Sequence, residues 1–390
     1  MAGQRYTVYE MIERLVAFDT TSRESNLGLI DFVADYLAGH GVTSRRVFDD
    51  TGAKANLFAT LGPEGPGGIV LSAHTDVVPV DGQDWSSDPF TVVRRGGRLY
   101  GRGTADMKSF PAVALALAPA LLARAPRIPV HLALSYDEEV GCLGAPRLVD
   151  LITASGLAPS VVIIGEPSGM KVVNRHKGVT RFATVVDGLA AHSAYTDRGV
   201  SAIFEAGEVL HFLGKLAEDL AVRADGAGEY DPPYHTIHVG RIAGGTAANI
   251  IPRRCQIDWE ARMLPGHDLA ETVVGPLEAF VAESLLPRMH AVSEKTGIST
   301  EMVLDVAPLR PEPDSAAEAL VRALAGDNSP SGAISFGTEG GIYQSGGYAA
   351  VVCGPGSILQ AHGPDEYIDI DQVEACIAFM GRLIDHVCRP

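Results

Sequence analysis

Histidine and carboxylate side chains stand close to the ends of several apolar runs in this chain. The run GGIVLSAHTD ends with His74 and Asp76, and VHLALSYDEE ends with Asp137, Glu138 and Glu139. Imidazole and carboxylate are the ligands expected for zinc, cobalt or manganese in a hydrolytic site. These residue types therefore predict a metal centre at which water attacks a carbonyl group.

Three further segments carry residues of the same kinds. Glu166 ends SVVIIGEP, His362 lies in AAVVCGPGSILQAHGPDE, and Asp106 in GRGTADMKS directly precedes a long apolar helical stretch. Each acid has a simpler explanation when taken singly, since Asp106 could cap the helix and Glu166 could be an acid stabilised before a turn at Pro167. Together they provide enough ligands for two ions that share one bridging carboxylate.

The spacing within two of these groups suggests a division of roles. His74 and Asp76 suit a metal ligand and the carboxylate that orients it, although such a pair also occurs by chance on surfaces. Glu138 and Glu139 point in different directions if the chain is extended, so one could bind metal while the other transfers protons. A solvated acidic turn is the alternative for this pair.

An alternation of strands and helices predicts the fold class of the first half. Helices are expected near 6–18, 24–40, 109–125 and 141–155, and strands near 55–60, 68–73, 130–136 and 160–165. This is an α/β pattern with buried parallel strands. Open parallel sheets bind ligands at the carboxyl ends of their strands, so the acids and histidines should converge on one crevice.

The pattern changes between about residues 180 and 308. Strand RFATVVDG, helix SAIFEAGEVLHFLGKLAEDLAVRA, strands HTIHVGRI and RCQIDWEARM, helix DLAETVVGPLEAFVAESLLPRM and strand STEMVLDV follow one another. This βαββαβ order is that of a ferredoxin-like unit. A helix from 315, the strand YAAVVCG and a helix over 371–387 then resume the first pattern. We therefore predict a discontinuous domain of residues 1–179 and 309–390, with 180–308 inserted.

Composition excludes several classes of partner. The chain has 390 residues and a formal net charge of −17, which disfavours nucleic acid and anionic membranes. The apolar stretch AVALALAPALLA is too short to span a bilayer, and the N-terminus lacks the features of a secretory signal, so a cytoplasmic protein is expected. Five cysteines without a CxxC pair suggest neither a disulfide framework nor a thiolate zinc site.

The motifs LSAHTDVVP, GRGTADMKS, DEEVGCLGA, GEPSGMKVV and AHGPDEY resemble, in order, the metal-site motifs of the M20 family of metallo-amidohydrolases. The resemblance covers nearly the whole chain. It implies an α/β catalytic domain with a mixed, largely parallel sheet, interrupted by a ferredoxin-like domain that serves as dimerisation or lid domain. RHKG, SFGTEGGIYQSGG and VVCGPGSILQAHGPDEY are similar to a deacetylase branch, which implies hydrolysis of N-acetyl-L-ornithine.

The resemblance also implies roles for individual residues around two divalent ions, Zn²⁺ or Co²⁺. One ion would be held by His74, Asp106 and Glu166, and the other by Asp106, Glu139 and His362. Glu138 would act as general base and then as general acid, and Asp76 would orient His74.

Four residues outside the metal motifs complete the expected site. His192 matches a histidine that, in dimeric relatives, reaches the opposite subunit's site and stabilises the oxyanion, which implies a homodimer. Asn249 and Arg262 match substrate-binding residues, and a guanidinium suits an α-carboxylate; a surface ion pair is the alternative for Arg262. Glu339 could pair with the side-chain ammonium of ornithine, or it could be a loop acid that caps a turn or faces water.

Other functions remain open at this point. Within the family they are a succinyl-diaminopimelate desuccinylase, a broad N-acyl-amino-acid amidohydrolase and a dipeptidase. A catalytically silent protein that binds metal or amino acids is a different class, and a non-enzymatic scaffold is a third. The presence of Glu138 argues against a catalytically inactive binding protein, because holding metal does not require a residue that transfers protons.

Overall fold

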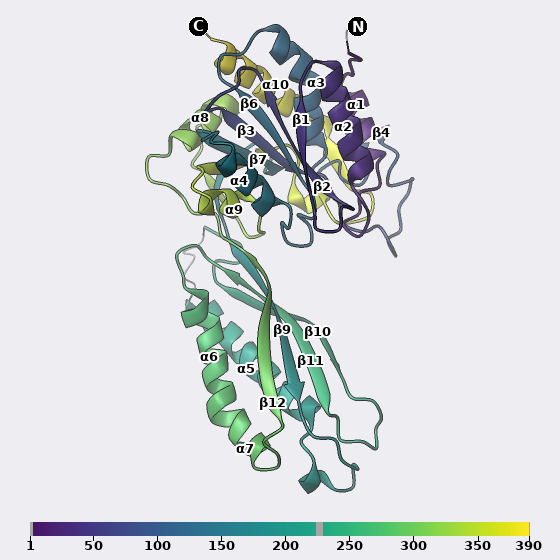
Figure 1. Ribbon diagram of the computed structural model, residues 1–390, viewed down its shortest axis with the longest axis vertical. Helices are drawn as coiled ribbons and strands as arrows, with labels where there is room; N and C mark the ends of the chain where they lie inside the picture. The colour runs from purple at the N-terminus through teal and green to yellow at the C-terminus, as the bar shows by residue number, and fades with distance from the viewer. Residues whose placement is uncertain (1–2, 224–228, 390) are drawn as a thin grey trace. The chain divides into compact units, whose positions relative to one another are not determined.

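The computed structural model describes residues 3–223 and 229–389. The chain forms two compact units (Figure 1). The first contains the residues up to Arg175, Leu309–Ala333 and the chain from Thr338 onward; the second contains His176–Pro308 and Ile334–Gly337. The first border therefore lies four residues before the expected 179, and a short segment after 333 also joins the second unit.

A mixed eight-stranded sheet forms the centre of the first unit, which confirms the predicted fold class. Its strands, in spatial order, are β1 (Ser44–Phe48), β2 (Ala55–Leu61), β6 (Val130–Ser135), β3 (Ile69–His74), β7 (Val161–Pro167), β14 (Ala350–Gly354), β8 (Val173–His176) and β13 (Gly332–Ile334). Strand β3 pairs in parallel with β6 and β7, and β7 pairs in parallel with β14. These four strands are the long apolar runs of the sequence, and their residues are buried.

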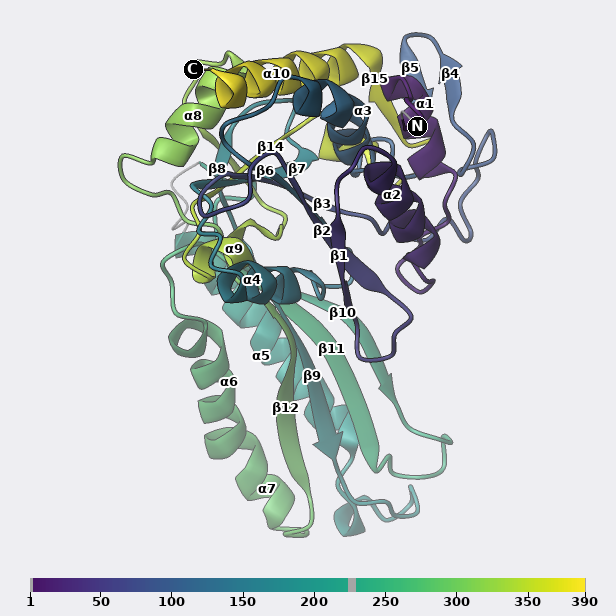
Figure 2. The same ribbon diagram turned by 45° about the horizontal axis from the view of Figure 1, so that its top comes forward.

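Helices cover both faces of this sheet (Figure 2). One face shares a core with α1 (Val8–Val16), α2 (Leu27–Gly39), α3 (Ser109–Ala123), α8 (Ala316–Ala325) and α10 (Ile370–Cys388). The other face packs against α4 (Ala145–Ala154) and α9 (Gly340–Ser345). Helix α3 is apolar nearly all round because it lies between the sheet and neighbouring helices. A small sheet of β4 (Val93–Arg95), β5 (Arg98–Tyr100) and β15 (Tyr367–Asp369) lies beside this core.

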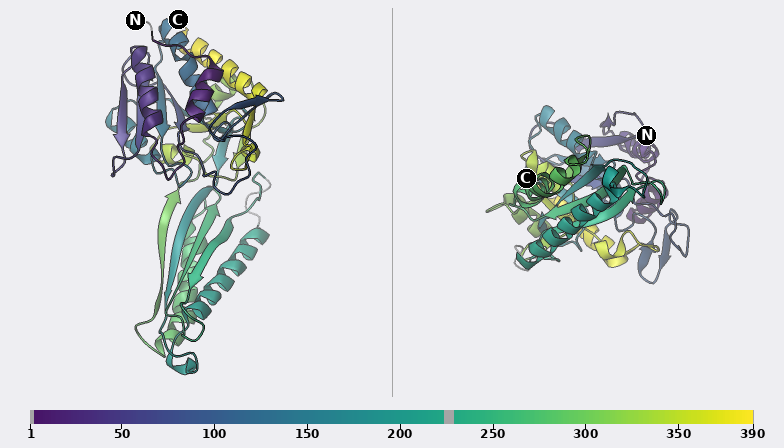
Figure 3. Two further views of the ribbon diagram at one scale, coloured as in Figure 1. Left: turned by 90° about the vertical axis from the view of Figure 1, so that its right-hand side faces the viewer. Right: turned by 90° about the horizontal axis from the view of Figure 1, so that it is seen from below.

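The second unit is a four-stranded antiparallel sheet with its helices on one face (Figure 3). The order along the chain is β9 (Gly178–Asp187), α5 (Ala202–Arg223), β10 (Thr236–Gly244), β11 (Arg254–Met263), a helical segment containing α6 (Gly275–Phe280) and α7 (Leu286–His290), and β12 (Gly297–Val306). This is the predicted βαββαβ order. The predicted helix reached residue 224, which lies outside the described residues. Alternate residues of β11 face the helices and are buried, as a sheet covered on one side requires.

None of the described helices is both long enough and apolar enough to cross a bilayer.

Candidate metal centre

The parallel strands of the first unit bring the predicted ligands to one edge of the sheet. His74 is the last residue of β3, Glu166 lies near the end of β7, and Glu138 and Glu139 follow the end of β6. Because His74 pairs with Ser135 in register, the ends of β3 and β6 are level with each other. The sheet thus aligns side chains that lie far apart in the sequence.

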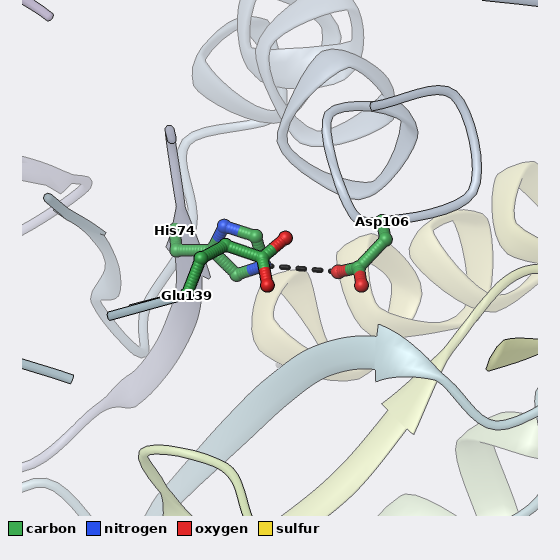
Figure 4. Close-up of side chains that lie close together, drawn as sticks. All are labelled: His74, Asp106 and Glu139. Carbon is green, nitrogen blue, oxygen red and sulfur yellow. Dashed lines mark hydrogen bonds and ion pairs between the residues drawn. The ribbon is translucent and has the colours of Figure 1, made fainter. Parts of the chain in front are cut away.

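Asp106 lies between the two histidines of the site. Its Oδ1 is 3.0 Å from His74 Nε2, and its Oδ2 is 3.2 Å from His362 Nε2. His74 Nε2 also lies 3.5 Å from Glu166 Oε1, and His362 Nε2 lies 3.1 Å from Glu139 Oε2. Figure 4 shows His74, Asp106 and Glu139 pointing toward one another. The arrangement has two halves, and each half uses one oxygen of Asp106.

The two halves differ in exposure. His74, Asp106 and Glu166 are buried. His362 is carried by a turn, with a positive φ of 64°, and its side chain is 51% exposed. The half that contains His362 therefore depends on loop contacts to hold its ligand, whereas His74 and Glu166 are fixed by buried strands.

The electrostatics of the site follow from burying acids beside imidazoles. Burial opposes a charge on His74, but hydrogen bonds with Asp106 and Asp76 outweigh it and raise the pKa of His74 well above its usual value. Hydrogen bonds with Asp106 and Glu139 raise the pKa of His362 to about 10. Burial acts to raise the pKa of Asp106, but its contacts with the two histidines lower it.

The pKa values of the three glutamates are raised, whereas that of Asp106 is lowered. Burial, followed by repulsion from neighbouring carboxylates, raises the pKa of Glu139 to about 7. Burial is also the first cause of the strongly raised pKa values of Glu138 and Glu166. So many acids in one buried place repel one another unless cations compensate them.

The donor set fits divalent metal ions. Among the described residues, His74, Asp106 and Glu139 form one group of potential ligands, and His74, Glu138 and Glu166 form another. Within each group the donor atoms lie within 4.8 Å of one another. Nitrogen and oxygen donors around a carboxylate that faces both ways suit a pair of zinc or cobalt ions.

Asp76 contacts more than the histidine beside it in sequence. Its Oδ1 accepts a hydrogen bond from the backbone N–H of Glu138 (3.0 Å), and its Oδ2 accepts from Glu139 N–H (3.2 Å) and from the Ser22 hydroxyl (2.7 Å). The nearest acceptor for His74 Nδ1 is the backbone carbonyl of Asp76 at 2.9 Å, while the carboxylate lies at 3.5 Å. Asp76 therefore anchors the turn that carries Glu138 and Glu139, and it also contacts His74.

Two residues at the site were not found from the sequence. Ser22 lies in DTTSRE, where nothing in the spacing connects it with Asp76. Cys142 is buried, and its thiol lies 3.3 Å from Glu138 Oε1, to which it can donate. Its position four residues after Glu138 could have suggested this contact only if the turn geometry were already known.

Glu339 is buried, so the alternative of a loop acid facing water is wrong. Its side chain is 1% exposed, and its Oε2 accepts a hydrogen bond of 2.9 Å from the Ser72 hydroxyl. Burial raises its pKa, against hydrogen bonds from Ser135 and Ser72. Its Oε1 nevertheless meets no donor in good geometry among the described residues. This leaves one carboxylate oxygen with unused hydrogen-bonding capacity close to the strand that ends in His74.

The remaining predicted residues belong to the second unit, where they lie at opposite ends of its sheet. Arg262 pairs with Val179 at one end, and its Nε donates to Glu260 Oε1 at 2.8 Å. His192 and Asn249 lie beyond the other end, where the two segments are joined by a hydrogen bond from Ser193 N–H to the Asn249 carbonyl. About 25 Å of strand separates the two ends, at roughly 3.3 Å per residue.

Comparisons with known proteins agree with this fold and identify the family. The model of peptidase family M20/M25/M40 matches residues 70–386, and the chain belongs to this family. It is therefore a metallo-hydrolase that acts on amide bonds. It is 36% identical to an acetylornithine deacetylase of Myxococcus xanthus, over 97% of this chain and 96% of that protein. It is 33% identical to that of Proteus mirabilis, over 98% and 97%.

Solved structures share the fold at lower identity. An M20 metallo-carboxypeptidase from Sulfolobus solfataricus superposes with a TM-score of 0.74 at 18% identity, over 98% of this chain and 99% of that one. A Bacillus subtilis protein described as a dinuclear metal-binding peptidase of the M20 family gives a TM-score of 0.64 at 15% identity, over 97% of both chains.

Proposed function

We propose that this enzyme hydrolyses N-acetyl-L-ornithine to L-ornithine and acetate. The observation that carries the proposal is the pair of half-sites around Asp106, with the carboxylate of Glu138 beside them. The names of the full-length relatives support acetylornithine as the substrate. A cytoplasmic role in arginine biosynthesis is part of the proposal, and the net charge of −17 argues against nucleic acid or anionic membranes as partners.

We assign five residues to two divalent ions, Zn²⁺ or Co²⁺. One set of ligands is His74, Asp106 and Glu166, and the other is Asp106, Glu139 and His362. When bound, such ions polarise the scissile carbonyl and lower the pKa of water. The contacts of Asp106 with both histidines support its place as the shared ligand.

Proton transfer is assigned to Glu138. It takes the proton of the attacking water and returns it to the nitrogen of the leaving amine. Asp76 holds the backbone of Glu138 and Glu139 in place, so that one carboxylate stays free for proton transfer while its neighbour binds metal. Burial raises the pKa of Glu138, which suits a group that must both accept and release a proton.

Substrate contacts are assigned to Arg262, Asn249 and Glu339. Arg262 and Asn249 would bind the polar groups of the amino acid, with the guanidinium facing its α-carboxylate. The unused oxygen of Glu339 supports a pairing with the side-chain ammonium of ornithine. Glu339→Gln should then raise KM for acetylornithine much more than KM for acetylmethionine, which lacks the distal charge. Equal effects on both substrates would place ammonium recognition elsewhere.

A homodimer completes the proposal. The opposite positions of Arg262 and His192 in the sheet mean that one copy of the second unit cannot place both on one small substrate. In a two-fold dimer, His192 and Asn249 of one copy would both act in the partner's site, where His192 would stabilise the oxyanion and Asn249 would bind the substrate.

The decisive experiment is a substrate panel on metal-free and metal-loaded protein. After chelation we expect no turnover, and after addition of Zn²⁺ or Co²⁺ we expect turnover of acetylornithine well above that of succinyl-diaminopimelate or a dipeptide. Full activity of the chelated protein would refute the metal mechanism. A preference for succinyl-diaminopimelate would keep the mechanism and change the substrate.

A further inference from the structure

Two buried side chains of opposite charge lie within the metal-site motifs without belonging to the ligand set. Arg102, in GRGTADMKS, and Glu366, in AHGPDEY, are each 1% exposed, and Arg102 Nη1 donates to Glu366 Oε2 at 2.7 Å. A buried ion pair is weak evidence for stability, because desolvating both charges offsets much of their attraction. What the pair is connected to is therefore more informative than the pair itself.

One end of this pair holds the backbone of Asp106. Glu366 Oε1 accepts hydrogen bonds from the N–H groups of Ala105 (2.9 Å) and Asp106 (3.1 Å). In addition, the Gly101 N–H donates to the Glu366 carbonyl at 2.9 Å. The loop before α3 is thus fixed to the segment that follows His362.

The other end reaches His362 through Gln83. Arg102 Nη2 donates to Gln83 Oε1 at 2.7 Å, and Gln83 Nε2 donates to the carbonyl of His362 at 2.8 Å. Trp85 Nε1 also donates to Gln83 Oε1 at 3.0 Å, and the Arg102 guanidinium lies 5.0 Å from the centre of the Trp85 ring. A continuous chain of contacts therefore runs from the Asp106 amide to the His362 carbonyl.

His362 is the ligand that most needs such support. It has a positive φ and lies half exposed on a turn, whereas His74 and Glu166 are held by buried strands. Gln83 binds its backbone directly, so the imidazole can meet Asp106 and Glu139 without a large loss of loop entropy when an ion binds.

We propose that Gln83, oriented by the buried Arg102–Glu366 pair, is a positioning residue for the half-site of Asp106, Glu139 and His362. It sets the affinity for the ion in that half and leaves the affinity of the His74–Glu166 half unchanged. The inference rests on the proposed two-metal site and adds residues that hold its ligands without touching the ions.

The test is titration of metal-free protein with Co²⁺ by calorimetry, which resolves two binding events if their affinities differ. Gln83→Leu removes all three hydrogen bonds of the side chain, those with Arg102, Trp85 and His362. Gln83→Glu keeps an oxygen for Arg102 and Trp85 but loses the donor to His362. We expect the half-site that contains the exposed His362 to hold the weaker ion. Its Kd should rise about 10- to 100-fold in both variants, as for other groups that orient metal ligands. The Kd of the tighter ion should stay near the wild-type value in both variants. The melting temperature of the metal-free protein should stay near the wild-type value in Gln83→Glu, which keeps the acceptor for Arg102, and should fall in Gln83→Leu, which leaves that donor unpaired.

Arg98→Gln is the matched control. Arg98 forms an ion pair with Asp369 on the small sheet at 2.9 Å, and both side chains are partly exposed. Arg98→Gln should change the affinity for neither Co²⁺ ion. If both Gln83 variants bind two ions as tightly as the wild type, or if both affinities fall equally, the positioning role is refuted. A wild-type protein that binds no divalent ion would instead refute the proposed function, and this inference with it.

Discussion

The contacts of Asp76 allow a quantitative prediction for Asp76→Asn. The two carboxylate oxygens accept from different backbone N–H groups, Oδ1 from Glu138 and Oδ2 from Glu139. Asparagine has the same shape but only one acceptor oxygen. In either orientation of the amide, one of these N–H groups must therefore face an NH₂ group in a buried environment.

The cost can be worked out from these contacts. Losing one hydrogen bond to a charged acceptor, with its donor left unsatisfied, costs about 2–4 kcal/mol. For a domain of this size, each kcal/mol lowers the melting temperature by roughly 2–4 °C. Thermal unfolding of chelated protein should therefore show a decrease of about 5–15 °C, without a contribution from lost ions. Metal affinity should fall as well, by about 10- to 100-fold, because both glutamates and His74 lose their anchor.

Asp268→Asn provides the control. Asp268 also accepts from two backbone N–H groups, those of Ala270 and Glu271, but it is exposed, and water can replace a lost contact. Its substitution should cost less than about 0.5 kcal/mol. If Asp76→Asn melts within 2 °C of the wild type, with the uncertainty of the method taken as about that size, the anchoring role of the carboxylate is wrong.

Three further predictions concern proton transfer, assembly and acid stability. Glu138→Gln should retain both ions, measured by elemental analysis, and lose about 10²- to 10⁴-fold in kcat; near-native turnover would reassign the base. Mixing His192→Ala subunits with Glu138→Gln subunits should restore some activity, since one hybrid site would have both groups intact; no recovery in isolated heterodimers would exclude action across the interface. Burial lowers the pKa of His176 to about 4, so the folded protein keeps it neutral while the unfolded chain binds a proton near its usual value of about 6.5. The contribution of neutral His176 to the free energy of unfolding is therefore fully present above about pH 6.5. It is lost as the pH falls toward 4, by up to about 3 kcal/mol. In His176→Asn, the free energy of unfolding measured by urea titration should depend less on pH between about 6.5 and 4. An unchanged pH dependence would contradict this prediction.

The long apolar strands were predictable because burial on both faces demands continuous apolar sequence. Runs such as GGIVLSAH and VHLALS identify β3 and β6, and the parallel arrangement then determines where their ends lie. The candidate ligands follow directly from this, since they stand where the strands stop. This part of the site needed no knowledge of loop conformation.

Short polar strands could not be found in the same way. Strand β1 is SRRVF, with Arg45 and Arg46 on an edge of the sheet, and β4 and β5 have three residues each. Their local sequences resemble charged loops, because pairing with a neighbouring strand, rather than intrinsic preference, makes them extended. The sequence equally fails to predict the contacts of these segments and of the loops around them. The hydrogen bond of Gln83 with the His362 carbonyl is an example.

The positions of Asn249 and Arg262 show why proximity in sequence misleads on an extended strand. They are separated by little more than the length of β11, and each residue of an extended strand adds roughly 3.3 Å. The strand therefore carries Arg262 about 25 Å away from the loop that holds Asn249 and His192. A small substrate cannot touch both ends of one sheet. If all three residues bind it, as the proposed function requires, the groups at one of these ends must come from a second copy of the chain, which makes the dimer a condition of catalysis in this proposal.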